Sequence, residues 1–360
     1  MRILHFINDL RVGGTENSLV NYCSDDKYNE HFIVAFGTSS AFQERLDENN
    51  VELLKINFKE SFFSSISELI KIIKKFKPDI IHSWMYHVHF VSFVLSLFGY
   101  KVIWSIRNHD ISRKNNGFVT FFLIKVLAVI SNIYVKKIIF NSLKSKSEHC
   151  SNGFSIKKSI VIFNGYKLPE GLDSIQKEDF NSILNIISVG RYEDVKNHDL
   201  LFNCLSLLKK EGFSFKCTLV GKNFNTLNNF LISKLNNLNI FENIELFNFR
   251  KDIKIFYKKF DISILTSNFE SFPNVLAESM ICGVPCISTD VGEARKIISN
   301  YGYVIQKNNI EQLKNSLIDF YEFKKDKEYL YFLKNNCQKH IQNNFGFDQM
   351  NKEFQKVYDI

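Results

Sequence analysis

Short hydrophobic runs alternate with amphipathic segments along most of the chain. In the first 165 residues the apolar runs are RILHFI, HFIVAF, VELLKI, DIIHSW, KVIWSI, KKIIFN and SIVIFNG. The segments between them carry apolar residues at the three- and four-residue spacing of helices. Strands and helices that alternate in this way build a parallel sheet with helices on both faces. Residues 1–165 therefore predict one Rossmann-like domain.

The alternation stops at YKLPEGLDSIQKEDFNS, a polar stretch that contains Pro169 and Gly171. We predict a linker over residues 166–180. The pattern then starts again with LNIISVG, FKCTLVG, NIELFN, DISILT and VPCIST, which predicts a second Rossmann-like domain over residues 181–345. Residues 346–360 are expected to form a C-terminal helix that packs back toward the first domain. Ligands of such sheets bind beyond the carboxyl ends of the strands, so two domains facing each other across a cleft are expected.

The segment SNFESFPNVLAESMICGVP predicts a short helix over residues 274–282. Pro273 suits the first position of a helix, and Gly283 suits its end. The unpaired backbone N–H groups at such a helix start are a common site for phosphate. Here they belong to Asn274, Val275 and Leu276.

Two carboxylates flank this helix start. Glu270 precedes the helix and Glu278 lies about a turn and a half inside it. Such carboxylates could hold the neutral, hydroxyl-rich part of a ligand whose charged part sits at the helix end. The alternative is a helix-entry carboxylate and a solvated helix residue without any ligand.

Two cations follow the first strand of the second domain, in SVGRYEDVKNHD. Arg191 and Lys196 could neutralise a diphosphate, Arg191 as a fork and Lys196 as a point charge. The sequence has no Asp-x-Asp and no His, Asp or Glu cluster with metal-ligand spacing, so a nucleotide diphosphate would need protein cations in place of Mg²⁺. We therefore expect no metal and no cofactor. The alternative is a pair of solvated loop charges.

The cysteines and the charge bear on where the protein works. Seven widely spread cysteines without a C-x-x-C pair suggest buried thiols in a reducing compartment, and no signal-peptide core follows the first residue, so a cytoplasmic protein is expected.

The net charge is +8, and residues 1–165 hold 21 Lys and Arg against 14 Asp and Glu. A basic, aromatic-rich half without a nucleic-acid motif favours anionic lipid over nucleic acid as a partner.

Two helical segments of the basic half are membrane candidates. SISELIKIIKKFK places Lys71, Lys74, Lys75 and Lys77 beside an apolar stripe, which suits a membrane surface or, alternatively, a helix packed on its own sheet. FVTFFLIKVLAVISNIYV approaches membrane-spanning length, but Lys125 in its middle favours a buried core helix.

Several motifs in the right order resemble one family. VGGTE, VGRYEDVKNHD and SNFESFPNVLAESMICGVPCISTDVGE resemble the retaining GT-B glycosyltransferases of family GT4, whose signature is a glutamate, seven residues and a second glutamate. PDIIHSWMYHVHF followed by VIWSIRN resembles the bacterial branch that builds O-antigen and capsular polysaccharide. The similarity runs from residue 1 to the C-terminal FGFDQMNKEFQKVYDI.

The resemblance implies roles for individual residues. Arg191 and Lys196 would grip the donor diphosphate, Glu278 would bond the nucleotide ribose, and Glu270 would contact the transferred sugar. The donor would also meet the helix start at Asn274, Val275 and Leu276, the loop at Gly14 and the backbone around Arg250. Many relatives carry a histidine after the strand that corresponds to VIWSI. This chain has Arg107 there and His109 two residues later, and either residue could take that role.

The function implied by the resemblance is a metal-independent, retaining transfer of a sugar from a nucleotide diphosphate sugar, with UDP expected. The acceptor would be a glycan, carried by a polyprenyl diphosphate, and the enzyme would be cytoplasmic with a peripheral position at the inner face of the membrane.

Alternatives from other classes remain. A UDP-sugar epimerase can share the fold, but the paired glutamates argue against it, and a glycogen phosphorylase relative would need a pyridoxal phosphate lysine. A nicotinamide oxidoreductase is disfavoured because neither glycine loop has the full fingerprint. A non-enzymatic basic binding protein would bind oligonucleotides with a strong salt dependence.

Overall fold

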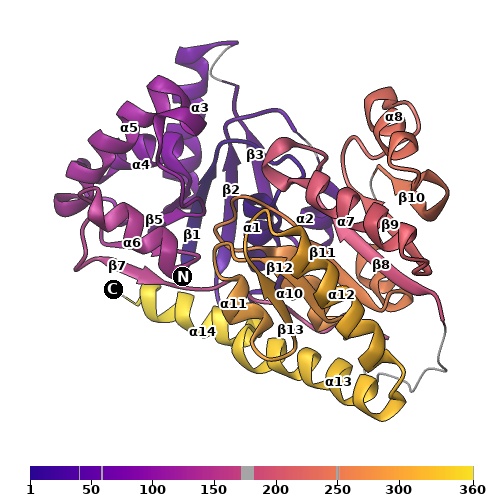
Figure 1. The fold of residues 1–360 in the computed structure, drawn as a ribbon. Coiled ribbons are helices and arrows are strands. Elements are labelled where there is room, and N and C mark those ends of the chain that lie inside the picture. Colours follow the sequence, from indigo (N-terminus) through magenta and orange to yellow (C-terminus); the bar gives the residue numbers. More distant parts are fainter. Residues whose placement is uncertain (40, 58–59, 172–181, 249, 251, 360) are drawn as a thin grey trace. The chain divides into compact units, whose positions relative to one another are not determined.

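The chain folds into two compact units (Figure 1). The computed structural model describes residues 1–39, 41–57, 60–171, 182–248, 250 and 252–359, except for the side chains of residues 62, 114 and 115. Unit 1 comprises Met1–Asn164 and Met350–Ile360, and unit 2 comprises Gly165–Gln349. Residues 172–180 of the predicted linker lie outside the described residues.

Unit 1 is built on a seven-stranded parallel sheet with the order β3-β2-β1-β4-β5-β6-β7. Its central strands are buried on both faces, which is why they are continuous apolar runs without alternation. The strands are β1 (Arg2–Ile7), β2 (Glu30–Ala35), β3 (Glu52–Lys55), β4 (Ile80–Trp84), β5 (Val102–Ile106), β6 (Lys137–Phe140) and β7 (Ser159–Val161).

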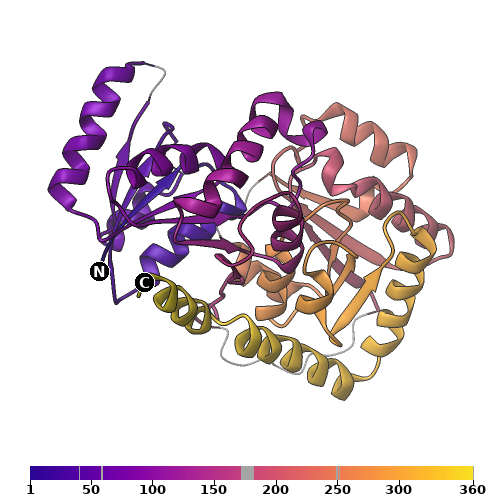
Figure 2. The same cartoon turned by 90° about the vertical axis from the view of Figure 1, so that its left-hand side faces the viewer.

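Helices cover both faces of this sheet. They are α1 (Gly14–Asp25), α2 (Gln43–Glu48), α3 (Phe62–Phe76), α4 (Tyr86–Ser96), α5 (Arg113–Ile133) and α6 (Leu143–Ser151). Right-handed connections between parallel strands place α3 to α6 on one face and α1 and α2 on the other. Figure 1 shows α3 to α6 as one layer, and Figure 2 turns this layer toward the viewer. The apolar side of α3, with Leu69, Ile73 and Phe76, belongs to the core under this layer, so the packed-helix alternative holds for that stripe.

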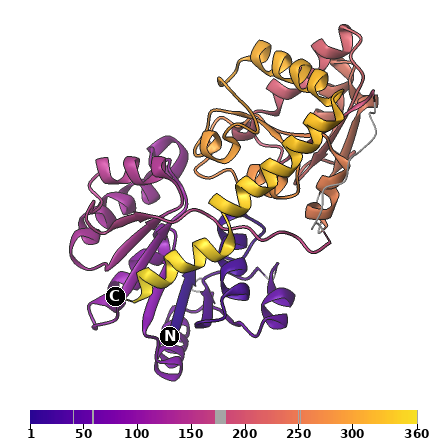
Figure 3. The ribbon, with the colours of Figure 1, turned by 90° about the horizontal axis from the view of Figure 1, so that it is seen from below.

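The second face of the sheet receives the last helix, α14 (Phe347–Tyr358) (Figure 3). The ring of Phe354 lies 4.5 Å from that of Tyr22 in α1. The Tyr358 hydroxyl lies 2.8 Å from Nδ1 of His82 in β4. Residues from opposite ends of the chain therefore share one core in unit 1.

The structure corrects the prediction for the long apolar helix. Its residues 116–133 form the one helix among the described residues that is long and apolar enough to cross a membrane, yet only 22% of this window is buried. The prediction that this helix is buried in the core is therefore wrong for most of its residues. Ile124, Leu127 and Ala128 pack on the sheet, whereas Lys125 is exposed and bonds Asn152 at 2.9 Å.

Unit 2 repeats the architecture with a six-stranded parallel sheet in the order β10-β9-β8-β11-β12-β13. Its strands are β8 (Leu184–Val189), β9 (Phe215–Val220), β10 (Ile244–Phe247), β11 (Ile262–Leu265), β12 (Cys286–Thr289) and β13 (Gly302–Ile305). Its helices are η1 (Asp194–Lys196), α7 (His198–Lys210), α8 (Asn229–Asn237), η2 (Phe241–Asn243), α9 (Ile253–Phe256), η3 (Tyr257–Lys259), α10 (Asn274–Ile281), α11 (Ala294–Ile298), α12 (Ile310–Lys324) and α13 (Lys327–Asn344).

All seven cysteines are free thiols, as the sequence predicted. Six are buried, and Cys150 in α6 is half-buried. Burial raises the pKa of Cys204, Cys282 and Cys286 to about 12, so these thiols stay protonated at neutral pH.

Candidate active site

The best candidate site lies where the strand order of unit 2 reverses. β8 connects outward to β9 and β10, whereas β11 leads to β12 and β13 on the other side of β8. The loops that leave the carboxyl ends of β8 and β11 are therefore neighbours, which is the usual ligand position in an open parallel sheet. A hydrogen bond of 2.8 Å from the Asn268 N–H to the Val195 carbonyl joins the two loops. Every candidate residue that follows β8 or β11 is thus on this edge.

Lys196 and Glu270 form an ion pair between these loops. Lys196 Nζ lies 2.6 Å from Glu270 Oε1, and the side chains are 18% and 16% exposed. The Ser267 hydroxyl donates to the same carboxylate oxygen at 2.7 Å. The Thr266 hydroxyl donates to the Lys196 carbonyl at 3.1 Å. The cation and the first glutamate of the predicted signature are therefore held together as one hydrogen-bonded pair.

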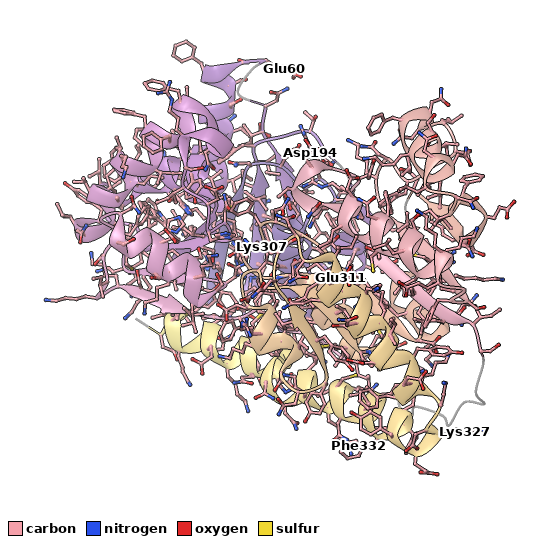
Figure 4. The ribbon with its side chains drawn as sticks, in the orientation of Figure 1. Glu60, Asp194, Lys307, Glu311, Lys327 and Phe332 are labelled. Atoms are coloured by element: carbon pink, nitrogen blue, oxygen red, sulfur yellow. The ribbon has the colours of Figure 1, made fainter. Side chains whose placement is uncertain are left out.

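Arg191 is placed differently. It follows β8 in the same loop, is exposed, and its Nη1 lies 3.2 Å from Glu193 Oε1. A solvated pair of this kind stabilises the fold little and exchanges easily for another anion. Asp194, labelled in Figure 4, also lies in this loop, in η1. Arg191 is thus available to a ligand, while Lys196 is held.

The start of α10 partly corrects the prediction. Pro273 is the residue before the helix, with φ −74° and ψ 85°, and not its first helical residue. The Leu276 N–H donates to the Pro273 carbonyl at 3.1 Å, so it is not one of the unpaired donors that we expected. Asn274 Oδ1 accepts a hydrogen bond of 2.6 Å from the Tyr166 hydroxyl. Leu276 therefore leaves the predicted set of anion-binding amides, of which Asn274 and Val275 are the other two members.

Glu278 is half-buried on α10. Burial raises its pKa above the ordinary value, and the charge of Lys254 in α9 opposes part of that rise. Burial, and after it the charge of Glu278, raise the pKa of Tyr257 well above its usual range. Lys254 and Tyr257 were missed by the sequence reasoning, because no motif surrounds them. They give Glu278 a partly desolvated environment with one cation and one phenol nearby.

Arg250 follows β10, the outermost strand of the sheet. Its guanidinium forms a fork with Asp252, with Nε–Oδ1 and Nη2–Oδ2 distances of 2.9 and 2.7 Å, and lies 3.8 Å from the centre of the Phe256 ring. Its flanking residues 249 and 251 lie outside the described residues. The side chain of Arg250 is therefore engaged with its own loop, which leaves the backbone as the predicted contact to a base.

The loop of Glu270 is supported from β12 and the turn after it. The Thr289 hydroxyl donates to the Ser267 carbonyl at 2.6 Å. Gly292 has φ +50°, and a Cβ atom at this position would collide with the carbonyl oxygens of Glu270 and Ser271. Gly292 thus allows the close approach that holds the glutamate loop. The sequence carried a signal for this in the motif TDVGE, which was noted only as part of the family resemblance.

The remaining predicted residues belong to unit 1. Gly14 is the first residue of α1, and Arg107 follows β5 at the carboxyl edge of the sheet. Arg107 is 7% exposed, with its guanidinium 4.5 Å above the Trp84 ring and a hydrogen bond from Nη1 to Asn164 Oδ1. The Ser18 hydroxyl donates to the same Asn164 oxygen at 3.1 Å. His109 is also buried. The structure thus gathers Arg107 with Trp84 and Asn164, while Arg191, Lys196, Glu270 and α10 form the separate cluster in unit 2.

A buried relay of hydrogen bonds lies under α1 in unit 1. The Trp84 indole can only donate, so its 3.2 Å contact makes Nδ1 of His5 an acceptor. Nε2–H of His5 then donates to Nδ1 of His31 at 2.9 Å, and Nε2–H of His31 donates to Asp26 at 3.0 Å. Burial works to raise the pKa of Asp26, but hydrogen bonds from His31 and Asn29 outweigh it and hold that pKa well below the usual range.

This relay explains a cluster that has the composition of a metal site. His5, Cys23 and His31 offer three ligand atoms within 4.8 Å of one another, which no sequence spacing indicated. A metal on Nε2 of His5 would move the ring proton to Nδ1, where it would face the Trp84 donor. Burial also raises the pKa of Cys23 well above its usual range, which disfavours the thiolate that binds metals. The residues therefore fit a hydrogen-bond relay better than a metal site.

Other histidines of unit 1 are also buried and hydrogen-bonded. His82 contacts the hydroxyls of Tyr358 and Ser105, and Nδ1 of His89 lies 2.7 Å from the Ser83 hydroxyl. Burial lowers the pKa of His82 and His89 well below the ordinary value, and it lowers that of His149 to about 4. These side chains are structural and neutral at neutral pH.

The fold and the site define a class of protein. The structure of HepE from Anabaena in complex with UDP-glucose aligns with 100% of this chain and 99% of its own, with a TM-score of 0.81 at 17% identity. Two Rossmann-like units with a candidate site at the switch point of the second define the GT-B fold, and the predicted fold class is confirmed.

The sequence comparisons lead from the class to the family. The model described as "Glycosyltransferase Family 4" matches residues 12–168, and that described as "Glycosyl transferases group 1" matches residues 175–337. The chain belongs to the family 4 glycosyltransferases, and the predicted resemblance is confirmed.

Two curated relatives place this family membership in context. An "uncharacterized 41.2 kDa protein in cps region" of Klebsiella pneumoniae is 25% identical over 82% of this chain and 84% of its own. An N-acetylgalactosamine-N,N'-diacetylbacillosaminyl-diphospho-undecaprenol 4-alpha-N-acetylgalactosaminyltransferase of Campylobacter jejuni is 29% identical over 50% of each chain. This chain thus spans about half the length of that named transferase.

Proposed function

We propose that this glycosyltransferase moves a sugar from a UDP-sugar to a lipid-linked glycan, with retention of the anomeric configuration and without a metal, in the synthesis of a surface polysaccharide. The carrying observation is the Lys196–Glu270 pair, which lies at the switch point of unit 2 beside the start of α10. The names of the relatives support the substrate classes, because they include UDP-glucose, a diphospho-undecaprenol glycan and a cps region.

Donor binding divides between charged and neutral groups in this proposal. Arg191 and Lys196 bind the diphosphate, and the first amides of α10 add their dipoles. Glu278 accepts hydrogen bonds from the ribose hydroxyls, for which its partly buried position near Lys254 and Tyr257 is suited. Glu270 accepts a hydrogen bond from a hydroxyl of the transferred sugar while it keeps its contact with Lys196.

The chemical step needs no nucleophile from the protein in this proposal. The acceptor hydroxyl attacks the anomeric carbon on the face that the diphosphate leaves. The bond from the anomeric carbon to the β-phosphate oxygen breaks with its electron pair on UDP, and the hydroxyl proton passes to a phosphate oxygen. Lys196 and Arg191 lower the barrier because they meet charge that grows on the β-phosphate. Gly14, Arg107 and His109 of unit 1 are proposed to act on the acceptor or the donor sugar.

The proposal also covers where the enzyme works. An enzyme with a cytoplasmic nucleotide sugar and a membrane-anchored acceptor is expected at the inner face of the membrane. No nucleic acid is a substrate in this proposal.

Binding of UDP, GDP and ADP, each with and without Mg²⁺, tests the donor class by thermal shift. Selective, metal-independent stabilisation by UDP is expected, and Glu278→Gln should lose most of it while folding normally. Lys210→Ala, an exposed cation at the far end of α7, serves as the matched control. Stabilisation by GDP or ADP alone, or only with Mg²⁺, would contradict the proposal.

Retention is tested on the product. The coupling constant of the new anomeric proton, measured by NMR after transfer to a synthetic lipid-linked acceptor, should match the configuration of the donor. An inverted product would refute the retaining mechanism without affecting the donor assignment.

A further inference from the structure

Unit 1 exposes apolar side chains on two neighbouring helices, α4 and α5. Phe90 of α4 is exposed, as are Leu97 and Phe98 directly after it. On α5 the exposed residues Phe118, Phe122 and Val129 follow the four- and seven-residue spacing of one helix face. We call these six residues the outer face. They lie on the layer of helices that Figure 2 turns toward the viewer.

The part of unit 1 that carries the outer face is strongly basic. Residues 86–161 contain eleven Lys and Arg but only two Asp and Glu, a net charge of +9 that exceeds the +8 of the whole chain. One cation lies near a ring of the outer face, since the Arg113 guanidinium is 5.2 Å from the Phe118 ring. Lys125 on the same helix has its Nζ 5.7 Å from the half-buried Phe121 ring, beside that face. Lys101, Lys136, Lys144 and Lys157 are also exposed. An apolar face in a strongly basic region suits the boundary between the headgroups and acyl chains of an anionic bilayer.

The same helix cannot span the bilayer while unit 1 stays folded. Ile124, Leu127 and Ala128 are buried in the core that α5 shares with the sheet. Pulling α5 into a membrane would remove these side chains from that core. Only the opposite side of the helix is free to enter lipid, so α5 would lie on the membrane and not across it.

Charge also distinguishes a bilayer from a second copy of the chain. Two copies that met through the outer face would bring two regions of +9 together, and like charges at that range repel. An anionic surface gains from every one of these cations. We propose that the outer face is the surface by which this enzyme binds an anionic phospholipid bilayer. This deepens the proposed function, because it names the surface that brings the enzyme to a lipid-linked acceptor.

This membrane-binding surface is not the basic helix α3 that the sequence indicated as a membrane candidate. Leu69, Ile73 and Phe76 of α3 are buried in the core, whereas Lys71, Lys74 and Lys75 are exposed. α3 can therefore contribute long-range attraction, but its buried stripe cannot enter the lipid. Apolar contact with the membrane is assigned to α4 and α5.

The test is co-sedimentation of the full chain with vesicles of pure phosphatidylcholine and of equal parts phosphatidylcholine and phosphatidylglycerol. The variant Phe118→Ser/Phe122→Ser removes two rings that are 64% and 63% exposed, so folding should be unaffected. The control Phe230→Ser/Phe332→Ser removes two rings of unit 2 that are 68% and 60% exposed, one of which is labelled in Figure 4. UDP binding is measured on each protein as the separate test of the donor site.

The wild type and the control should bind the anionic vesicles, and this binding should weaken in high salt. Both proteins should bind the neutral vesicles poorly. The Phe118→Ser/Phe122→Ser variant should lose about a hundredfold in partition to anionic vesicles, about tenfold per ring. Its UDP binding should be unchanged.

Three results would overturn the proposal. They are no binding of the wild type to anionic vesicles, equal binding by the double variant, or loss of binding only when Lys71, Lys74 and Lys75 are replaced by Gln. A wild-type dimer that the double variant disrupts, with vesicle binding unchanged, would assign the outer face to a second copy and would also overturn it.

Discussion

The two partners of the Lys196–Glu270 pair should have opposite effects on UDP affinity. Removing the charge of Glu270 should raise the affinity, and removing that of Lys196 should lower it. The distance of 2.6 Å corresponds to an attraction of about 6 kcal/mol at an effective dielectric constant of about 20, which is an upper bound before desolvation is subtracted. Because both side chains are mostly buried, removing one charge should leave a net penalty of about 3 kcal/mol on the other. In Glu270→Gln the unpaired cation can recover this energy from a diphosphate, whereas in Lys196→Ala the diphosphate loses its cation.

We therefore expect Glu270→Gln to bind UDP about tenfold more tightly, a gain of about 1.4 kcal/mol, because water and the introduced amide side chain recover the remainder. Lys196→Ala should bind UDP more weakly and lose on the order of a hundredfold in turnover. Both affinities are measured by isothermal titration calorimetry, with Lys210→Ala as the control.

Two results would refute this reasoning. Unchanged UDP affinity in Lys196→Ala would show that Lys196 does not meet the diphosphate. Weaker binding by Glu270→Gln, to the same extent as Lys196→Ala, would show that the carboxylate positions the cation and does not compete for it.

Three further predictions concern stability and the support of the site. Gly292→Ala should lower turnover at least tenfold because its Cβ displaces the glutamate loop, whereas Gly212→Ala, also at positive φ but without a neighbour within 4 Å, should cost only about 1 kcal/mol of stability and no activity. Lys324→Met leaves the buried Asp261 carboxylate, 2.7 Å from the Lys324 ammonium, without its cation, and should lower the free energy of unfolding in urea by about 3–5 kcal/mol. Lys325→Met breaks only an exposed pair and should lower it by less than about 1 kcal/mol. Four of the buried histidines of unit 1, His5, His82, His89 and His149, have lowered pKa values, so the unfolded chain binds more protons below pH 6.5. The stability of the folded state therefore decreases as the pH is lowered, by about 1.4 kcal/mol for each of these histidines at about pH 5.5. The fluorescence of the two tryptophans, both in unit 1, should report unfolding near that pH, and a flat signal down to about pH 4 would contradict this sign.

The two βα alternations were predictable because buried parallel strands leave continuous apolar runs in the sequence. The partnership of Lys196 and Glu270 was not, since the residues are 74 apart and meet only because β11 pairs with β8. Each residue could be placed at the carboxyl end of a strand, but the strand order is a property of the whole sheet. Long-range packing, and not local pattern, brings the candidate residues together.

The errors have local causes. The Leu276 N–H was expected to be unpaired, but ψ of 85° at Pro273 turns its carbonyl toward that donor. The apolar helix at 116–133 was expected to be buried because Lys125 in its middle argues against a membrane span, but neither that lysine nor the hydrophobic content indicates how much of the helix surface is covered. Tyr257 and Lys254 near Glu278 carried no signal in the sequence, because a lone phenol and a lone amine occur throughout the chain.

The return of α14 to unit 1 has a consequence for biosynthesis. Unit 2 is a continuous stretch, Gly165–Gln349, whereas unit 1 needs residues 350–359 to cover Tyr22, His82 and Trp84. Unit 1 therefore cannot be completed until these last residues have been made, although most of it is synthesised first, and until then Tyr22, His82 and Trp84 lack the cover of α14. The first domain to be translated is thus the last to be completed, and a nascent chain arrested before residue 350 would present that aromatic surface to chaperones.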